Sequence, residues 1–436
     1  MKTTFAEADL RIPSIREASV EIEKCRHYGF CTATCPTYVL LGDEKDSPRG
    51  RIDLIKEMLE QGGAPDADTV KHLDRCLSCM SCTTTCPTSI DYAKLIDVGR
   101  EYIEENYKRP APDRLLRTLI GKLLTSPRLF RLSMLGAALG RPFARLLGAK
   151  LGGMVAMTKQ LTLGRSEYEG VPLVRPEGNV RHRVALLEGC VQKVVGTQIN
   201  DATIRLLARH GCEIHMPPSI GCCGSLPLHI GKGDAAREFA RRAVDAWHAA
   251  IVKDGVEAII INASGCGTTV KDYGHILAED ADYAEKARVV AGHAFDIAEW
   301  LVKIGLRPTR QAAIRVAYHD PCSLQHAQRV IAQPRELLKQ AGFEVVNIPE
   351  RHLCCGSAGT YNMLQPDIAR QLGERKGANV DRARADVLAT GNIGCMTQIE
   401  QYAGTPIVHL VELLDWATGG TEPAALAHLI DQEGGR

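Results

Sequence analysis

The stretch RCLSCMSCTTTCPT, residues 75–88, decides the fold of the N-terminal part of the chain. Its cysteines, Cys76, Cys79, Cys82 and Cys86, stand in the pattern Cys-x2-Cys-x2-Cys-x3-Cys-Pro. Thiolates are the soft ligands that iron–sulfur clusters use, and two-residue spacings let one loop wrap around a face of a cubane. Zinc sites more often use cysteine pairs separated by a longer loop, so we favour an iron–sulfur cluster.

A second run, KCRHYGFCTATCPTY (residues 24–38), repeats this pattern 51 residues earlier with one change. Tyr28 stands where the second cysteine is expected. In two-cluster ferredoxins the fourth cysteine of each run binds the other cluster. That rule predicts two ligand sets: Cys76, Cys79, Cys82 and Cys35 for an intact 4Fe–4S cluster, here called cluster II, and Cys25, Cys31 and Cys86, with Tyr28 at the fourth corner, for cluster I.

Three outcomes stay open for cluster I. A 3Fe–4S cluster needs only three cysteines, and loss of the middle ligand is the change that would produce one, so we favour it. A 4Fe–4S cluster with Tyr28 phenolate, hydroxide or water on the fourth iron is the second outcome. A degenerate site is the third, and the intact spacing of the other cysteines argues against it. Tyr28 packed in the core above a 3Fe–4S cluster would fit the first outcome.

The C-terminal half contains an internal duplication. Cys190 is followed after 31 residues by Cys222-Cys223-Gly224, and Cys322 is followed after 31 residues by Cys354-Cys355-Gly356. A Gly-Cys pair then ends each copy. The two sets of four cysteines are Cys190, Cys222, Cys223 and Cys266, and Cys322, Cys354, Cys355 and Cys395.

The secondary structure expected around these cysteines explains how they could meet. Strands are expected at 183–189, 212–216 and 256–262 in the first copy, and at 314–320, 343–349 and 385–394 in the second. The helical patterns between them predict an α/β fold with parallel sheets. Ligands of such sheets gather at the carboxyl ends of the strands, where these cysteines lie. Each copy is therefore predicted to hold a metal or a cluster.

Four segments are predicted along the chain. Residues 1–110 form a helical ferredoxin-like domain, 111–180 a linker, 181–312 module 1 and 313–436 module 2. Within residues 114–166 there is no Asp or Glu, while ten Lys or Arg residues interrupt apolar ones. This block would lie on anionic lipid headgroups or pack on the modules or a partner. We favour packing, because Pro127, Pro142 and several glycines weaken the helices.

Composition excludes several classes of protein. The net charge of +1 gives no reason to expect binding to nucleic acid. Sixteen cysteines in a chain of 436 residues, with no signal-peptide pattern at its start, are typical of metal ligands in a reducing cytoplasm rather than of a secreted disulfide scaffold. No apolar run is long enough to span a membrane. We expect a cytoplasmic protein, with peripheral attachment to the inner face of the cell membrane as a further option.

His319 and His326 flank Cys322. They could tune or bind a cluster, or protonate an acceptor. A histidine at a strand end more often bonds to backbone groups, and that is the role we expect.

These motifs, together with DSPRGRIDLIKEML (46–59), LCCGSAGTYNMLQPDIARQLGERK (353–376) and GNIGCMTQI (391–399), resemble the iron–sulfur subunit of bacterial glycolate oxidase. The likeness runs from about residue 20 to the C-terminus. It implies that an FAD-containing partner oxidises the 2-hydroxy acid, while this chain passes electrons to a quinone or a similar acceptor. Family members normally carry cysteine where Tyr28 stands, so only the cluster II ligands carry over without change.

Alternative functions come from wider relatives. Similar cysteine runs occur in lactate-utilisation proteins, in the anaerobic glycerol-3-phosphate dehydrogenase iron–sulfur subunit and in heterodisulfide reductases. The reductases add a fifth cysteine, at positions that are Thr269 and Gln398 here, so a disulfide-cleaving role is disfavoured. Four thiolates per module could hold a cluster or a tetrahedral zinc ion, or some of them could be structural remnants that bind nothing. A zinc-binding scaffold without redox function is the most distant alternative.

Overall fold

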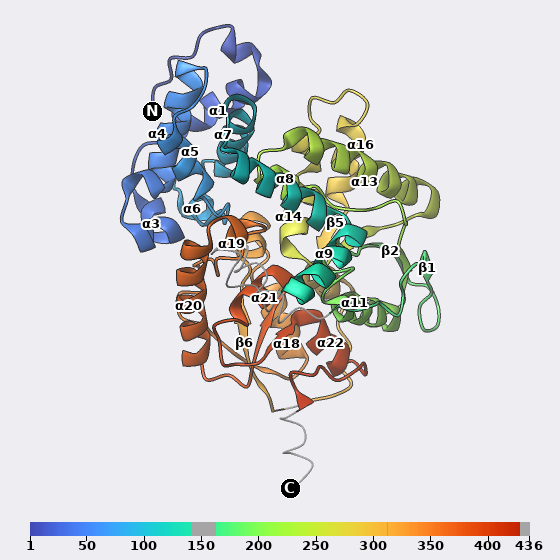
Figure 1. Ribbon diagram of the computed structural model, residues 1–436. Helices are drawn as coiled ribbons and strands as arrows, with labels where there is room; N and C mark the ends of the chain where they lie inside the picture. Colours follow the sequence, from blue (N-terminus) through green and yellow to red (C-terminus); the bar gives the residue numbers. More distant parts are fainter. Residues whose placement is uncertain (141–162, 312, 428–436) are drawn as a thin grey trace.

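The computed structural model describes residues 1–140, 163–311 and 313–427 (Figure 1). The N-terminal part is helical, as predicted. Prolines at the first helical position start several of its helices, where a missing N–H costs nothing. Its elements are η1 (Asp9–Arg11), α1 (Pro13–Lys24), α2 (Phe30–Thr34), α3 (Pro36–Leu41), η2 (Glu44–Asp46), α4 (Pro48–Gln61), α5 (Ala67–Asp74), α6 (Ser81–Thr85) and α7 (Tyr92–Asn106).

Module 1 is built on a five-stranded sheet in the order β1-β3-β2-β4-β5. All its neighbouring strands are parallel except β1, which pairs antiparallel with β3. Its elements are β1 (Leu173–Val174), β2 (His182–Leu187), α11 (Thr197–Arg209), β3 (Cys212–His215), α12 (Ser225–His229), α13 (Gly233–Asp254), β4 (Ala258–Ile261), α14 (Ser264–Lys271), α15 (Tyr273–Ile276), α16 (Ala284–Gly292), β5 (Ala294–Asp296) and α17 (Ile297–Ile304).

Module 2 repeats this topology with a parallel sheet in the order β7-β6-β8-β9. Strands β6, β7, β8 and β9 correspond to β2, β3, β4 and β5, which confirms the predicted duplication. The elements are β6 (Arg315–His319), the π-helical turn η4 (Ser323–Ala327), α18 (Gln333–Gln340), β7 (Glu344–Val346), α19 (Tyr361–Leu364), α20 (Pro366–Arg382), β8 (Val387–Thr390), α21 (Ile393–Ile399), β9 (Ile407–His409) and α22 (Leu410–Ala417).

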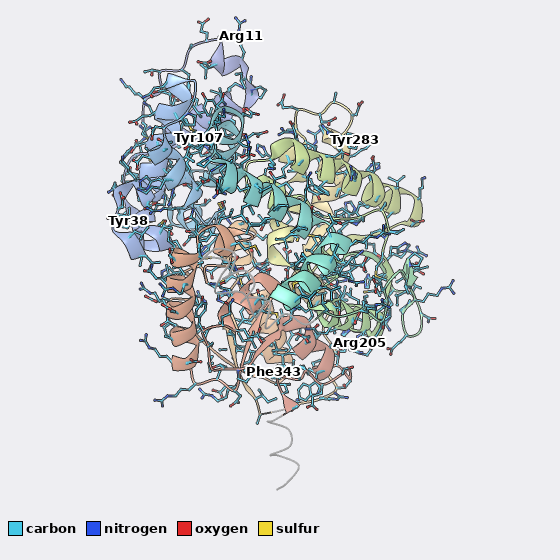
Figure 2. All side chains as sticks on the ribbon, in the orientation of Figure 1. Arg11, Tyr38, Tyr107, Arg205, Tyr283 and Phe343 are labelled. Carbon is cyan, nitrogen blue, oxygen red and sulfur yellow. The ribbon has the colours of Figure 1, made fainter. Side chains whose placement is uncertain are left out.

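The two modules share one core. Helix α11 of module 1 packs on α22, and α17 packs on α18, so that equivalent elements exchange partners as in a twofold interface. Val184, Val316 and Val387 of both sheets belong to the same buried cluster. Arg205 of α11, which is labelled in Figure 2, donates to Asp415 of α22 at 2.8 Å. Because Asp415 is fully buried, this ion pair fixes how the modules meet.

The predicted linker, residues 111–180, begins with two helices, α8 (Ala111–Thr125) and α9 (Pro127–Gly140). They run from the N-terminal helices across the modules (Figure 1). One face of this pair packs against Val194 and Val195 through Ile120, Leu124 and Phe130. This is the packing that the sequence favoured. Six leucines of the same helices are exposed: Leu115, Leu119, Leu129, Leu132, Leu135 and Leu139. Residues 141–162, which form most of the remainder of the acid-free block 114–166, lie outside the described residues. Among the helices that the structure describes, none is long and apolar enough to cross a membrane.

Candidate iron–sulfur and metal sites

The four cysteines predicted for cluster II line one cavity. Cys76 and Cys79 lie in the loop before α6, Cys82 lies in the first turn of α6, and Cys35 lies between α2 and α3. All four are buried. Arg51, Tyr92 and the prolines that follow Cys35 and Ser47 also line the cavity. A pocket with four soft donors fits an iron–sulfur cluster.

A neighbouring cavity is lined by Cys25, Cys31 and Cys86 together with Tyr28. The structure therefore brings the predicted cluster I residues together. Tyr28 is 62% exposed, and its ring centroid lies 6.4 Å from that of Phe30. Tyr28 packed in the core is thus the wrong interpretation. Cys82, Pro48 and Tyr92 line both cavities, so only one layer of side chains separates them.

The two halves of this domain share their local backbone. Residues 51 positions apart in equivalent loops have positive φ angles, as in His27 (54°) and Ser78 (50°). The last cysteine of each run has the same hydroxyl neighbour: Cys35 Sγ lies 3.3 Å from Thr37 Oγ1, and Cys86 Sγ lies 3.3 Å from Thr88 Oγ1. Tyr28 therefore changes one side chain in a frame that is otherwise kept.

Cluster II lies beside a buried charge network. The guanidinium of Arg51 donates to Asp46 at 3.1 Å and to Thr37 at 3.1 Å, and its Nη1 lies 3.8 Å from Cys35 Sγ. Asp46 also accepts from Arg75 at 2.8 Å and lies 3.0 Å from His72 Nδ1. A buried cation beside the ligands offsets the negative charge of thiolates, which favours their deprotonated form.

The thiol pKa values differ between the sites. Burial raises the pKa of Cys79 and Cys82 well above the usual value, and it raises that of Cys31 to about 11. Burial acts in the same direction on Cys86, but bonds from the Thr88 hydroxyl and nearby backbone N–H groups outweigh it and lower its pKa. Metal binding would offset these costs, because a metal ion binds the thiolate.

Each module brings its four cysteines into contact. In module 1 the Cys222 thiol is close enough to Cys190 and Cys223 to shift their pKa values, as Cys266 is to Cys223. In module 2 the Sγ atoms of Cys322 and Cys354 lie 3.7 Å apart, and Cys354 and Cys395 shift the pKa of Cys355 in the same way. The two predicted sets are therefore contiguous, and their donor chemistry fits either a cluster or zinc.

The glycine of each Cys-Cys-Gly triplet brings a helix against the cysteine pair. Gly224 has φ +87°, and a Cβ there would lie 3.0 Å from the carbonyl oxygen of Ala236. Gly356 has φ +91°, and a Cβ there would lie 2.7 Å from the carbonyl oxygen of Ala369. Only glycine combines this left-handed backbone with so close a helix.

His319 does not have the role that its sequence position suggested. It is fully buried at the end of β6, and neither ring nitrogen has a hydrogen-bond partner in the described part of the chain. One of its nitrogens and the Sγ atoms of Cys355 and Cys395 all lie within 4.8 Å of one another. The expected bond to backbone is therefore wrong for His319. It holds for His326, whose Nε2 lies 3.3 Å from the carbonyl oxygen of His352.

Lys376 is a site residue that the sequence reasoning missed. It is 2% exposed on α20, donates to the Glu350 carbonyl oxygen at 3.0 Å and faces Cys354, Cys355 and Cys395. Burial lowers its pKa. A signal was available, because Lys376 follows the buried Leu372 by four residues and so lies on the apolar stripe of its helix.

Module 2 and cluster II are direct neighbours. Cys79 and Leu77 belong to the same buried cluster as Cys354, with Cys322 packed against it. The hydroxyl of Tyr361 donates to the Arg75 carbonyl oxygen at 2.9 Å, and Thr84 Oγ1 lies 2.8 Å from His326 Nδ1. Figure 1 shows the N-terminal helices standing on α19 and α20 of module 2.

Comparisons with known families agree with this division of cysteines. The model of a 4Fe-4S dicluster domain matches residues 21–90, and that of a cysteine-rich domain matches residues 184–271 and 316–400. A crystal structure of a hypothetical protein from Helicobacter pylori has the same fold, with a TM-score of 0.55 and 9% identity over 95% of this chain and 74% of that one.

Two relatives are similar to the chain over most of its length. The glycolate oxidase iron–sulfur subunit of Escherichia coli K12 is 40% identical over 96% of this chain and 99% of its own length. A probable glycolate oxidase iron–sulfur subunit of Bacillus subtilis 168 is 31% identical over 92% and 94%. Lactate utilization protein A of Oceanobacillus iheyensis is 27% identical over 53% of this chain. The chain belongs to the family of glycolate oxidase iron–sulfur subunits, with the electron-transfer role in an oxidoreductase complex that its 4Fe–4S domain supports.

Proposed function

We propose that this chain carries electrons from an FAD-containing partner, which oxidises glycolate or another 2-hydroxy acid, to a quinone or a similar acceptor. The observation that carries the proposal is the pair of cysteine-lined cavities that share Cys82, Pro48 and Tyr92. Clusters held there would be neighbours, which single-electron transfer needs. The names of the E. coli and B. subtilis relatives support glycolate as the substrate of the complex.

We assign the ligands as the sequence predicted. Cluster II is a 4Fe–4S cluster bound by Cys76, Cys79, Cys82 and Cys35. Cluster I is a 3Fe–4S cluster bound by Cys25, Cys31 and Cys86. The exposure of Tyr28 supports this choice, because a phenolate ligand would have to turn its oxygen into the cavity. The chain is divided near residues 110, 180 and 312, with a cluster or zinc in each module.

Electrons would enter at cluster I. Tyr28 and Phe30 on its rim are 62% and 60% exposed, and large exposed aromatic side chains are common at protein interfaces. The cluster II cavity lies on the inner side, against module 2. The complex would act at the cytoplasmic face of the membrane, where the exposed leucines of α8 and α9 offer a second contact surface.

The test compares the purified chain with its complex. The chain alone should show the visible absorption of iron–sulfur clusters and no oxidation of glycolate with a dye acceptor. Glycolate should bleach that absorption only after the flavoprotein is added. Oxidation of glycolate by the chain alone would overturn the proposal, as would a protein that contains zinc but neither iron nor acid-labile sulfide.

A further inference from the structure

The two modules differ at three equivalent buried positions around their cysteines. At the ends of the paired central strands, module 1 has Leu187 beside Ile261, whereas module 2 has His319 beside Thr390. The third position lies on the helix after the Cys-Cys-Gly triplet, α13 in module 1 and α20 in module 2. It is Ala243 in module 1 and Lys376 in module 2, each seven residues after the alanine that lies against the glycine of the triplet. All six residues are at most 2% exposed. Module 2 thus has polar groups where module 1 is apolar.

Two of the polar groups in module 2 have no hydrogen-bond partner among the described residues. Neither ring nitrogen of His319 nor the hydroxyl of Thr390 has a partner in the part of the chain that the structure describes. A buried polar group without a partner is unfavourable, and such groups occur where a ligand or an ion satisfies them. Leu187 shows that the same strand end accepts an apolar side chain in module 1. We therefore expect the His319 imidazole to bind an ion or another group that is not part of the polypeptide.

The side chains around His319 are of the types that bind metals. One of its nitrogens, Cys355 Sγ and Cys395 Sγ all lie within 4.8 Å of one another, and Cys322 and Cys354 continue the group. Among the described residues of module 1, no three such donors meet this criterion. Five donors exceed the four of a tetrahedral zinc site, and soft thiolates favour iron and sulfide, so the set fits a polynuclear iron–sulfur centre.

We propose that module 2 holds an iron–sulfur centre with His319 as a ligand, and that module 1 holds none with an imidazole ligand. The inference rests on the proposed function. An imidazole is neutral, so a centre with His319 as fifth donor is less negative than one with a fifth thiolate and has a higher reduction potential. The positive charge of Lys376 would also raise the reduction potential of the centre. Because Cys79 packs against Cys354, one electron would pass from reduced cluster II to this centre, which oxidises the cluster and reduces the centre.

The direct test is pulsed electron paramagnetic resonance on the full-length protein, with histidine either unlabelled or labelled with ¹⁵N. The spectrum of a reduced centre should change with the isotope in the wild type. The change should be absent in His319→Leu, which installs the side chain of module 1, and iron per chain should fall. His326→Gln is the matched control: this histidine bonds to Thr84 and to the His352 backbone and should not affect the isotope-dependent signal.

The outcomes separate this inference from the proposed function. Cluster I and II signals without any isotope effect in the wild type would overturn the imidazole ligand alone. An isotope effect that survives in His319→Leu, or zinc in place of iron at module 2, would do the same. Absence of all cluster signals would overturn the proposed function and this inference together. Unchanged cluster I and II signals in His319→Leu show that the variant has folded.

Discussion

The two cysteine loops of the dicluster domain, residues 25–35 and 76–86, have the same secondary structure and differ at one ligand corner. Cys79 is buried, lines the cluster II cavity and contacts module 2, whereas its equivalent Tyr28 is 62% exposed on the rim of the other cavity. The loops, the positive φ angles and the hydroxyl neighbours of the last cysteines are otherwise shared. The pattern of glycines, prolines and cysteines thus sets the frame, while single side chains decide the chemistry at each corner.

The modules show the same relation at a larger scale. Both have four cysteines in contact and a glycine that admits a close helix, yet only module 2 adds His319 and Lys376. In both duplications the copies have diverged beside the ligands rather than in the elements that position them. The cluster II ligands and the module 2 cysteines are also neighbours, because Cys79 and Cys354 belong to the same buried cluster.

The largest effect is expected from Cys79→Ala compared with Tyr28→Ala. Loss of the Cys79 thiolate is the change that Tyr28 makes at cluster I, so cluster II should become 3Fe–4S, iron should fall by about one atom per chain and electron transfer should slow. Tyr28→Ala removes an exposed side chain, so it should leave iron unchanged and alter stability by no more than about 0.5 kcal/mol. Iron analysis and thermal unfolding measure both. Equal iron losses in the two variants would contradict the claim that Cys79 is a cluster ligand and Tyr28 is not.

Tyr28→Cys should make the two halves alike. It supplies the missing thiolate in a loop whose backbone already matches that of Cys79, so cluster I should gain about one iron atom and become 4Fe–4S. Iron and sulfide quantitation on the variant and the wild type measures the gain. Tyr28→Ser is the control, because it also removes the ring but offers no thiolate. A gain of iron in Tyr28→Ser as well would show that the ring, and not the missing thiolate, limits the site.

Charges around the two clusters should differ in their effect on stability. Asp46→Ala leaves the buried Arg51 without its carboxylate, which should cost about 3–5 kcal/mol. Glu44→Ala breaks the partly exposed pair with Arg49 beside cluster I, which should cost about 0–1 kcal/mol. Thermal unfolding of the loaded protein compares the two variants. Similar losses would mean that burial does not distinguish the two charge networks.

The smallest effect compares the helix caps of the modules. Asp296 and His409 are equivalent capping-box residues of α17 and α22, each followed three positions later by a glutamate. Burial raises the pKa of Asp296 to about 7 and lowers that of His409 to about 4. The stability that Asp296 contributes is therefore present at low pH and lost as the pH rises toward 7. That of His409 is present above about pH 6.5 and lost as the pH falls toward 4.

Asparagine keeps the cap at either position without titrating. The midpoint of thermal unfolding of Asp296→Asn, relative to wild type, should rise by on the order of a few °C from pH 4 to pH 7. For His409→Asn it should rise as the pH falls from 6.5 to 4. Differences that change in the same direction for both variants would contradict these assignments.

The sequence was enough to predict the cysteine sets and the strands that carry them, because ligand spacing and apolar strands are local patterns. It did not reveal β5 and β9, since strands of three residues are too short to show a period. Lys376 was overlooked because a lysine is usually taken for the wet face of a helix. The role of His319 depends on which atoms surround it in the folded chain, and spacing alone does not contain that information.

The most direct test of the account is the electron paramagnetic resonance spectrum of the oxidised protein. An oxidised 3Fe–4S cluster has an unpaired electron, whereas an oxidised 4Fe–4S cluster of the ferredoxin type has none. The wild type is predicted to show the 3Fe–4S signal before any reductant is added, and Tyr28→Cys is predicted to lose it. An oxidised wild type without that signal, with a spectrum that Tyr28→Cys leaves unchanged, would contradict the claim that Tyr28 sets the chemistry of cluster I.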